Sequence, residues 1–295
     1  MEKFDLSVII PSYNRADYLV KVLTLLGRQT YPCGRFEVIV ADDGSRDGTE
    51  DAVKRMQFQA PYSLTYIKQQ NAGPASARNK AVKASSAGIV LFTGDDILPK
   101  EDLIEEHIKS HRQNEGAAVL GFVDWSTEIE VTDFMRHVAP DGFQFRYGGI
   151  KDPNNCGFRY FYTSNISLSK KWLSKDQFDE GFPYGALEDT ELAYRLEKKG
   201  LRIILNMKAV GYHIHAMTMD SFCRRMRLVG LSAATLLRKH PELKPLFLPV
   251  NISIVALGFG ILKRLPLVEN INRRIYWQIQ IASAYVGGLR EGLSM

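Results

Sequence analysis

Short runs of β-branched residues alternate with helical segments along the N-terminal third of this 295-residue chain. The predicted strands lie at 6–14, 36–45, 64–69 and 88–94, and the predicted helices between them lie at 16–29, 47–59 and 74–86. This alternation is typical of α/β proteins, in which helices connect the strands of a mostly parallel sheet. Such sheets bind ligands beyond the carboxyl ends of their strands. We therefore expect a mostly parallel sheet flanked by helices, with the functional site at that edge.

Polar and acidic residues gather where these predicted strands end. The three clusters are Ser12-Tyr13-Asn14, Asp42-Asp43-Gly44-Ser45 and Asp95-Asp96. Adjacent carboxylates raise each other's pKa unless a cation or several hydrogen-bond donors compensate them. The Asp95-Asp96 pair therefore predicts a positive partner such as a divalent metal, although Asp is also common in a turn that precedes a helix.

The second half of the sequence is less regular. We expect helices at 102–114 and within 178–200, strands at 116–125, 161–170, 201–206 and 209–217, a loop-rich stretch at 126–160, and helices beyond Asp220. Residues 195–295 hold 16 Lys and Arg against 5 Asp and Glu, a net charge of +11, whereas 1–194 carry −6. The sequence therefore predicts a helical, basic C-terminal extension.

The extension contains a 17-residue apolar segment, 246–262, interrupted by polar residues and a proline. A spanning helix needs about 20 apolar residues, so a span, an interfacial segment beside anionic lipid and a buried helix all remain open. No nucleic-acid-binding module accompanies the basic residues. The start of the chain shows no secretory signal, and Cys33, Cys156 and Cys223 form no paired motif, so we expect a cytoplasmic protein with reduced thiols. The sequons at Asn165 and Asn251 are discounted on the same ground.

Four ordered blocks, SVIIPSYNRADYL, EVIVADDGSRDGT, NAGPASARNKAVKASSAGIVLFTGDDI and FDEGFPYGALEDTELAYRL, resemble the family 2 glycosyltransferases over about residues 5–215. The resemblance implies a GT-A fold in residues 1–218, with a nucleotide-sugar half at 1–98 and an acceptor half at 99–218. Residues 219–295 would form a basic and apolar region at the inner face of a membrane.

The resemblance further implies transfer with inversion from a UDP-, GDP- or dTDP-linked sugar, with Mn²⁺ or Mg²⁺ bound. Thr93 stands where the family's D-x-D motif has its first Asp, so Asp95 and Asp96 are the expected metal and ribose contacts. One of His213 and His215 is expected to complete the metal shell, although a lone His is more often structural.

The remaining donor-binding expectations also follow from the resemblance. Asp43 is expected to accept a hydrogen bond from the base and Tyr13 to pack on its ring, while the alternative for DDGS is a plain strand-to-helix turn. Arg78 is expected at the nucleotide or its phosphates, and a solvated helix Arg is the alternative. The full expected donor-binding set is Pro11, Ser12, Tyr13, Asn14, Asp42, Asp43, Gly73, Arg78 and Asp95.

Glu188 and Asp189 are the expected catalytic pair. A sugar hydroxyl is a poor nucleophile, so a carboxylate must take its proton as the new bond forms. A metal-screened diphosphate leaves readily, which predicts one base and no protein acid. Asp189 matches the family's base and Glu188 an acceptor contact, although acids also favour a helix N-terminus.

The expected acceptor is a glycan or lipid-linked precursor of a cell-surface polysaccharide, an inference from fold and composition alone. Arg224, Arg225 and Arg227 could support the diphosphate or a membrane surface, and a solvated basic helix face is the other interpretation. Two other classes stay open: a sugar nucleotidyltransferase, for which the chain lacks a Gly-rich loop after the first strand, and an inactive binding module, which Thr93 keeps open.

Overall fold

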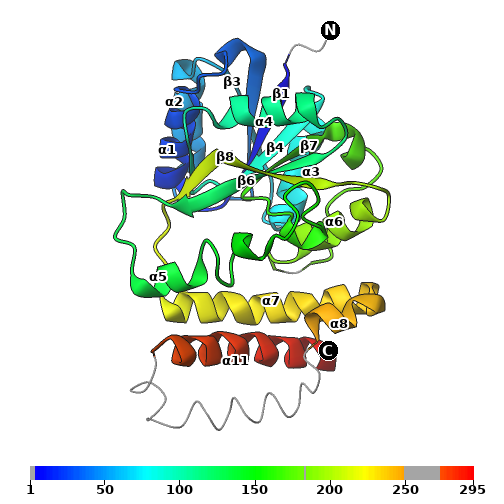
Figure 1. Ribbon diagram of the computed structural model, residues 1–295. Coiled ribbons are helices and arrows are strands. Elements are labelled where there is room, and N and C mark those ends of the chain that lie inside the picture. Colours follow the sequence, from blue (N-terminus) through cyan, green and yellow to red (C-terminus); the bar gives the residue numbers. More distant parts are fainter. Residues whose placement is uncertain (1–3, 183, 249–272) are drawn as a thin grey trace. The chain divides into compact units, whose positions relative to one another are not determined.

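The computed structural model describes residues 4–182, 184–248 and 273–295 (Figure 1). The described residues divide into two compact units, the first made of Met1–Val131, Ala139–Glu180 and Glu188–His215, the second of Thr132–Val138, Gly181–Leu187 and Ala216–Met295. Each unit has its own elements and is treated separately below.

The first unit is built on a mixed sheet. Within the described residues its eight strands lie in the order β3-β2-β1-β4-β7-β6-β8-β5. The strands are β1 Leu6–Ser12, β2 Phe36–Asp42, β3 Ser63–Lys68, β4 Ile89–Thr93, β5 Ile97–Pro99, β6 Ala118–Trp125, β7 Asn165–Ser169 and β8 Ile203–His213. Strands β3, β2, β1 and β4 are parallel, β7 is antiparallel to both its neighbours, and β8 is parallel to β6. The predicted mostly parallel α/β sheet is confirmed.

Helices cover both faces of the parallel strands (Figure 1). The helices of this unit are α1 Ala16–Leu26, α2 Thr49–Gln59, α3 Pro74–Ala84, α4 Leu103–Gln113 and α6 Glu188–Glu197, with 3₁₀ turns at Cys33–Arg35, Tyr147–Gly149, Phe158–Tyr160 and Lys170–Leu173. Leu19, Val22, Leu23 and Leu26 of α1 are buried at helical spacing, and they share one core cluster with alternate residues of β1. Helix α3 packs on β1 and β2, and as predicted its first residue is Pro74, which needs no backbone N–H partner there.

Two details differ from the sequence expectation. The segments 201–206 and 209–217 are one strand, β8, which ends at His213 and has a register shift against β6 between Gly121 and Phe122. The side chain of Asn165 stabilises this irregularity, since its Nδ2 donates to the carbonyls of Phe122 at 3.0 Å and Ala209 at 2.9 Å. Strand β5 was not expected, because a three-residue strand has no periodicity to recognise.

The second unit contains a closely packed helix pair. Its helices are α5 Asp133–Val138, α7 Met219–Lys239, α8 Lys244–Phe247 and α11 Arg273–Ser294, with a 3₁₀ turn at Pro241–Leu243. Helix α7 begins with a capping box, in which Ser221 N donates to Thr218 Oγ1 at 3.2 Å and Thr218 N to Ser221 Oγ at 3.0 Å. The basic, helical C-terminal region is thus observed where the structure describes it.

Most of the apolar segment 246–262 lies outside the described residues. Among the helices that are described, none has the length and apolarity that a membrane crossing requires.

Glycines allow α7 and α11 to approach backbone to backbone. A Cβ on Gly288 would lie 1.9 Å from the carbonyl oxygen of Arg227, whereas one on Gly287 would meet nothing within 4 Å. Gly288→Ala should therefore force the helices apart and lower the free energy of unfolding by about 1–3 kcal/mol. Gly287→Ala is the matched control and should stabilise the helix by up to about 1 kcal/mol. Thermal unfolding followed by circular dichroism measures both, and equal midpoints would contradict this packing.

Candidate active site at the strand ends

The carboxyl ends of β1 and β4 are joined by a direct side-chain contact. Ser12 Oγ, on the last residue of β1, donates to Asp95 Oδ2 at 2.8 Å. Both residues are buried, Ser12 at 4 % and Asp95 at 7 % exposure. Parallel pairing of β1 with β4 places these ends together. The clusters that follow the first and the fourth predicted strand, Ser12-Tyr13-Asn14 and Asp95-Asp96, therefore form one polar site, as predicted from their positions.

Asp96 lies among cationic and imidazole groups. Arg15 Nη1 donates to Asp96 Oδ2 and lies 3.6 Å from Asp95 Oδ1. His213 Nε2 lies 3.2 Å and His215 Nδ1 3.8 Å from the same Asp96 oxygen. Burial alone would raise the pKa of Asp96, but the two imidazoles and the Arg15 charge outweigh it and hold that pKa well below its usual value.

Asp95 is shifted in the opposite direction. Burial and the neighbouring Asp96 charge raise the pKa of Asp95 to about 7, against the opposing effects of Arg15 and the Ser12 hydrogen bond. Splitting of this kind is expected when two carboxylates share a low-dielectric site. At neutral pH the pair therefore carries less than two negative charges.

The donor set at this edge fits a divalent cation. Asp95 and Asp96 offer carboxylate oxygens, and the buried His213 has a ring nitrogen, Nδ1, without a hydrogen-bond partner among the described residues. No cluster of three or more His, Cys, Asp or Glu side chains suited to a metal occurs in the described part of the chain. Magnesium in nucleotide enzymes is held by one or two carboxylates together with substrate phosphates, so these few protein donors suffice for such an ion.

Three side chains that contact this cluster, two aromatic and one cationic, were not predicted from the sequence. Trp125 stacks on His213 with ring centroids 5.2 Å apart, and Tyr18 stacks on His215 at 6.0 Å. Arg15 was overlooked as well, although it directly follows the polar Ser12-Tyr13-Asn14 cluster at the end of the first predicted strand. The two aromatic rings therefore pack on the two imidazoles, and the Arg15 guanidinium compensates the two carboxylates.

Asp42 and Asp43 are buried, and their carboxylates accept hydrogen bonds from groups within the protein. Asp42 Oδ1 accepts from Ser45 N at 2.8 Å, and its Oδ2 accepts from the hydroxyl of Tyr66. The carboxylate of Asp43 accepts four bonds from the loop that precedes α3, donated by Gln69 Nε2, Ala72 N, Asn71 Nδ2 and Gly73 N. A carboxylate offers about four acceptor positions, so in this structure Asp43 fixes the loop at Gly73.

Gly73 and the residues at the end of β1 lie among the expected donor-binding residues. Gly73 has φ +90°, a backbone conformation that an L side chain rarely adopts. Asn14 also has a positive φ, 53°, and its Oδ1 accepts from Arg46 N at 2.8 Å. The Tyr13 side chain is 48 % exposed and Pro11 is half-buried. These residues thus form the rim of the strand-end site, and Tyr13 is available to a ligand.

Arg78 and Glu188 form a buried ion pair. Arg78 Nη1 donates to Glu188 Oε1 at 2.7 Å, with side-chain exposures of 11 % and 4 %. Arg78 Nε and Glu188 Oε2 have no hydrogen-bond partner among the described residues. The structure thus places Arg78, an expected donor-binding residue, on the expected catalytic pair.

Asp189 lies beside this pair in the first turn of α6. Burial and the charge of Glu188 raise the pKa of Asp189 to about 6, while Arg78 and the backbone N–H groups of Thr190 and Thr163 oppose the shift. Thr190 N donates to Asp189 Oδ1 at 2.7 Å. Asp189 is half-buried, and a carboxylate with a pKa near neutrality is suited to accept a proton from a substrate hydroxyl.

This chain is similar to known proteins in both sequence and structure. The family model of "Glycosyl transferase family 2" matches residues 7–175. The uncharacterized glycosyltransferase YfnE of Bacillus subtilis is 30 % identical over an alignment of 256 residues. The match covers 70 % of this chain and 64 % of that protein. Validoxylamine A glucosyltransferase of Streptomyces hygroscopicus subsp. jinggangensis is 28 % identical over 266 residues, 81 % of this chain and 62 % of that protein. The chain thus spans less than two thirds of these relatives' length.

Solved structures share the fold. The mannosyltransferase PcManGT from Pyrobaculum calidifontis, in complex with GDP-Man and Mn²⁺, matches with a TM-score of 0.70 at 21 % identity, covering 98 % of this chain and 86 % of that chain. TarS of Staphylococcus aureus with UDP-GlcNAc matches with a TM-score of 0.58 at 17 % identity, covering 98 % of this chain and 91 % of that one. The expected GT-A fold is confirmed, and the chain belongs to glycosyl transferase family 2.

Proposed function

We propose that this chain transfers a sugar, with inversion, from a nucleotide-diphosphate sugar to a hydroxyl of a glycan or lipid-linked acceptor. The observation that carries the proposal is the Asp189 carboxylate, half-buried beside the Arg78–Glu188 ion pair, whose raised pKa matches the requirement for a base near neutral pH. Complexes of PcManGT with GDP-Man and of TarS with UDP-GlcNAc support the donor class.

The strand-end site is the proposed donor site. Asp95 and Asp96, with His213 or His215, would hold Mn²⁺ or Mg²⁺, which supplies charge neutralisation to the leaving diphosphate. The Mn²⁺ in the PcManGT complex supports a divalent ion. Pro11, Ser12, Tyr13, Asn14, Asp42, Asp43, Gly73 and Arg78 complete the proposed donor-binding set.

Asp189 is the proposed general base. It takes the proton of the acceptor hydroxyl while that oxygen attacks the anomeric carbon opposite the diphosphate, and this in-line attack inverts the configuration. Glu188 would contact the acceptor, since its Oε1 is fixed by Arg78 and its Oε2 is unpaired among the described residues. No protein acid is required, because the diphosphate is a good leaving group once its charge is screened.

The domain boundary and location are also proposals. We place the catalytic domain at 1–218, with its nucleotide-sugar half at 1–98, and propose that 219–295 contact a membrane surface at its cytoplasmic side. The support is the basic composition of that region and the exposure of Arg224, Arg225 and Arg227.

Release of nucleotide diphosphate from a panel of UDP-, GDP- and dTDP-sugars, with Mn²⁺ or Mg²⁺ and with chelator, tests the donor and the metal. We expect release from one donor, and its loss both with chelator and in Asp96→Ala. Release that survives chelator and mutation would contradict the metal assignment. Metal-dependent binding of one nucleotide without turnover, with or without candidate acceptors, would instead indicate a binding module.

Arg15→Gln tests the charge balance of the acid pair. Removing the guanidinium leaves Asp95 and Asp96 with less compensation, so the thermal midpoint in metal-free buffer should fall by a few degrees. Added Mn²⁺ should then raise the midpoint more than it does in the wild type, because the cation replaces the lost charge. Lys21→Gln is the matched control on α1, since the Lys21–Glu128 ion pair is exposed. An equal Mn²⁺ shift in all three proteins would refute this role of Arg15.

The pH dependence follows from Asp189. A base must be ionised, so turnover at saturating Mn²⁺, which favours the ionised form of Asp95, should fall as the pH drops through about 6. The charged groups facing Asp189 are Glu188 on α6 and Arg78 on α3, with the phenol of Tyr162 before β7. Asp189→Asn should lower turnover by about 10²–10⁴-fold. A pH–rate profile that is flat from pH 5 to 8 would rule Asp189 out as the base.

The same substitution should affect stability with the opposite sign. The folded-state pKa of Asp189 lies above the ordinary aspartate value of 3.8, so the ionised carboxylate destabilises the folded protein increasingly as the pH rises through 4–6. Asp189→Asn should therefore raise the thermal midpoint at pH 7 while it lowers turnover. Asp152→Asn, at an exposed position, is the matched control and should change neither quantity.

A further inference from the structure

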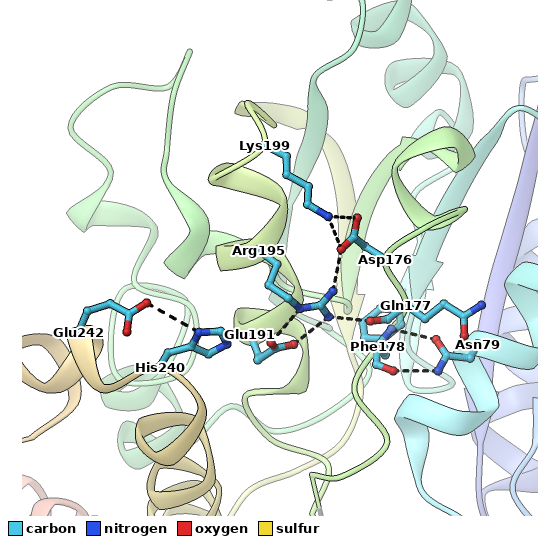
Figure 2. Close-up of polar contacts among 9 residues, drawn as sticks. All are labelled: Asn79, Asp176, Gln177, Phe178, Glu191, Arg195, Lys199, His240 and Glu242. Atoms are coloured by element: carbon cyan, nitrogen blue, oxygen red, sulfur yellow. Dashed lines mark hydrogen bonds and ion pairs between the residues drawn. The ribbon is translucent and has the colours of Figure 1, made fainter.

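A short segment, Asp176–Phe178, connects the helix of the catalytic pair to the nucleotide half of the first unit. It precedes α6 in sequence and contacts both α6 and α3 (Figure 2). None of its residues belongs to the proposed donor or catalytic set. Its side chains and backbone nevertheless make hydrogen bonds or ion pairs to Asn79, Arg195 and Lys199.

On the α6 side, Arg195 is the centre of the contact. Arg195 binds Glu191, one turn after Glu188, through two bonds of 2.8 Å from Nε and Nη2. The same guanidinium donates to Asp176 Oδ1 at 3.1 Å and to the carbonyl of Gln177 at 2.7 Å. Lys199 Nζ adds contacts of 2.7 and 2.6 Å to the two oxygens of Asp176. Both acids are largely buried, Glu191 at 2 % and Asp176 at 9 % exposure.

On the α3 side, Asn79 pairs with the backbone of one residue. Asn79 Nδ2 donates to the carbonyl of Phe178 at 2.9 Å, and the N–H of Phe178 donates to Asn79 Oδ1 at 3.0 Å. Asn79 Nδ2 also reaches Glu180 Oε1 at 2.9 Å. This arrangement satisfies the N–H and the C=O of Phe178 with a single amide, as Figure 2 shows.

The ring of Phe178 closes the connection at Arg78. It is 3 % exposed and meets the ring of Phe92 on β4 edge-on, with centroids 5.2 Å apart. The guanidinium carbon of Arg78 lies 5.3 Å from the Phe178 centroid, while Arg78 Nη1 holds Glu188. The contacts therefore form a closed circuit from α6 through Asp176–Phe178 and α3 back to the first turn of α6.

We propose that Asn79 and Arg195 are positioning residues for Asp189, because together they fix Asp176–Phe178 and thereby hold the first turn of α6 against α3. The proposal rests on the proposed function, in which Asp189 is the base. No hydrogen bond or ion pair among the described residues joins either side chain to Asp189, so both act through Phe178, Arg78 and Glu188. Displacing a catalytic group by about 1 Å is enough to cost about a hundredfold in rate.

The experiment compares four variants with two matched controls. Asn79→Ala and Arg195→Gln should each lower kcat by about 10–100-fold, with the donor KM and the nucleotide Kd within about twofold of wild type. Arg195→Lys should not restore the rate, because an ammonium lacks the planar fork that binds Glu191 and Gln177 together. The double variant should lose less than the product of the single losses, since both changes release the same segment.

The controls lie on the same elements or close to them. Lys80→Ala is adjacent to Asn79 and exposed, and Arg202→Gln removes an exposed guanidinium shortly after α6. Both should behave as wild type. Should Asn79→Ala fail to fold, Asn79→Asp keeps the acceptor for Phe178 N–H and replaces the amide donors by a carboxylate oxygen that faces the Phe178 carbonyl and Glu180, so it tests the same link.

Hydrogen exchange provides a readout that needs no turnover. Asn79→Ala and Arg195→Gln should speed exchange of amides in 188–197 while amides of β1 and β2 stay protected. Wild-type kcat and wild-type exchange in both variants would overturn the proposal, as would a KM and Kd that rise in parallel with the loss of kcat. If the wild type turns over no donor, the proposed function fails, and the exchange data alone then decide whether the circuit holds α6.

Discussion

The buried ion pair between Arg78 and Glu188 joins the two halves of the site. Arg78 belongs to α3, which follows the loop fixed by Asp43, and Glu188 precedes Asp189 in the first turn of α6. Both side chains are almost fully buried, and an uncompensated charge in such a place is strongly destabilising. The protein therefore folds with these two helices in one relative position. The position of α3 and that of Asp189, the proposed base, are thus linked by the same interaction.

The two acidic pairs of the site are compensated in different ways. Glu188 is held by a guanidinium that is 11 % exposed and is itself covered by the Phe178 ring. Asp95 and Asp96 face a guanidinium that is 32 % exposed, together with two imidazoles. A half-exposed cation on a long side chain is exchanged for a ligand's cation at lower cost than a buried one. The first arrangement suits a fixed framework, and the second suits a site that receives a charged ligand.

The sequence alone predicted the features that depend on local pattern. Alternating strands and helices, the proline that begins α3 and the acidic strand ends all follow from periodicity and turn chemistry within about ten residues. Contacts across the sheet did not follow, because they depend on register: Arg15 meets Asp96 only since β1 pairs with β4. The hydrogen bonds between Asn79 and Phe178 could not be predicted from the sequence either, because the two residues lie 99 positions apart. Asp43 was expected to read a base, and only the structure shows its acceptors engaged by the loop at Gly73.

Burial gives Asp189 its chemical character and also creates a structural demand. A solvated carboxylate would be too weak a base near neutral pH, and burial raises its pKa toward the useful range. The same burial makes the ionised form unfavourable, and the negative charge of the preceding residue, Glu188, adds to this cost. Arg78 and the N–H groups of Thr190 and Thr163 offset part of this cost, but they do so only while the first turn of α6 stays in place. The proposed base therefore requires a rigid surrounding, and the proposed circuit through Asp176–Phe178 would supply one from residues outside the proposed donor and catalytic sets.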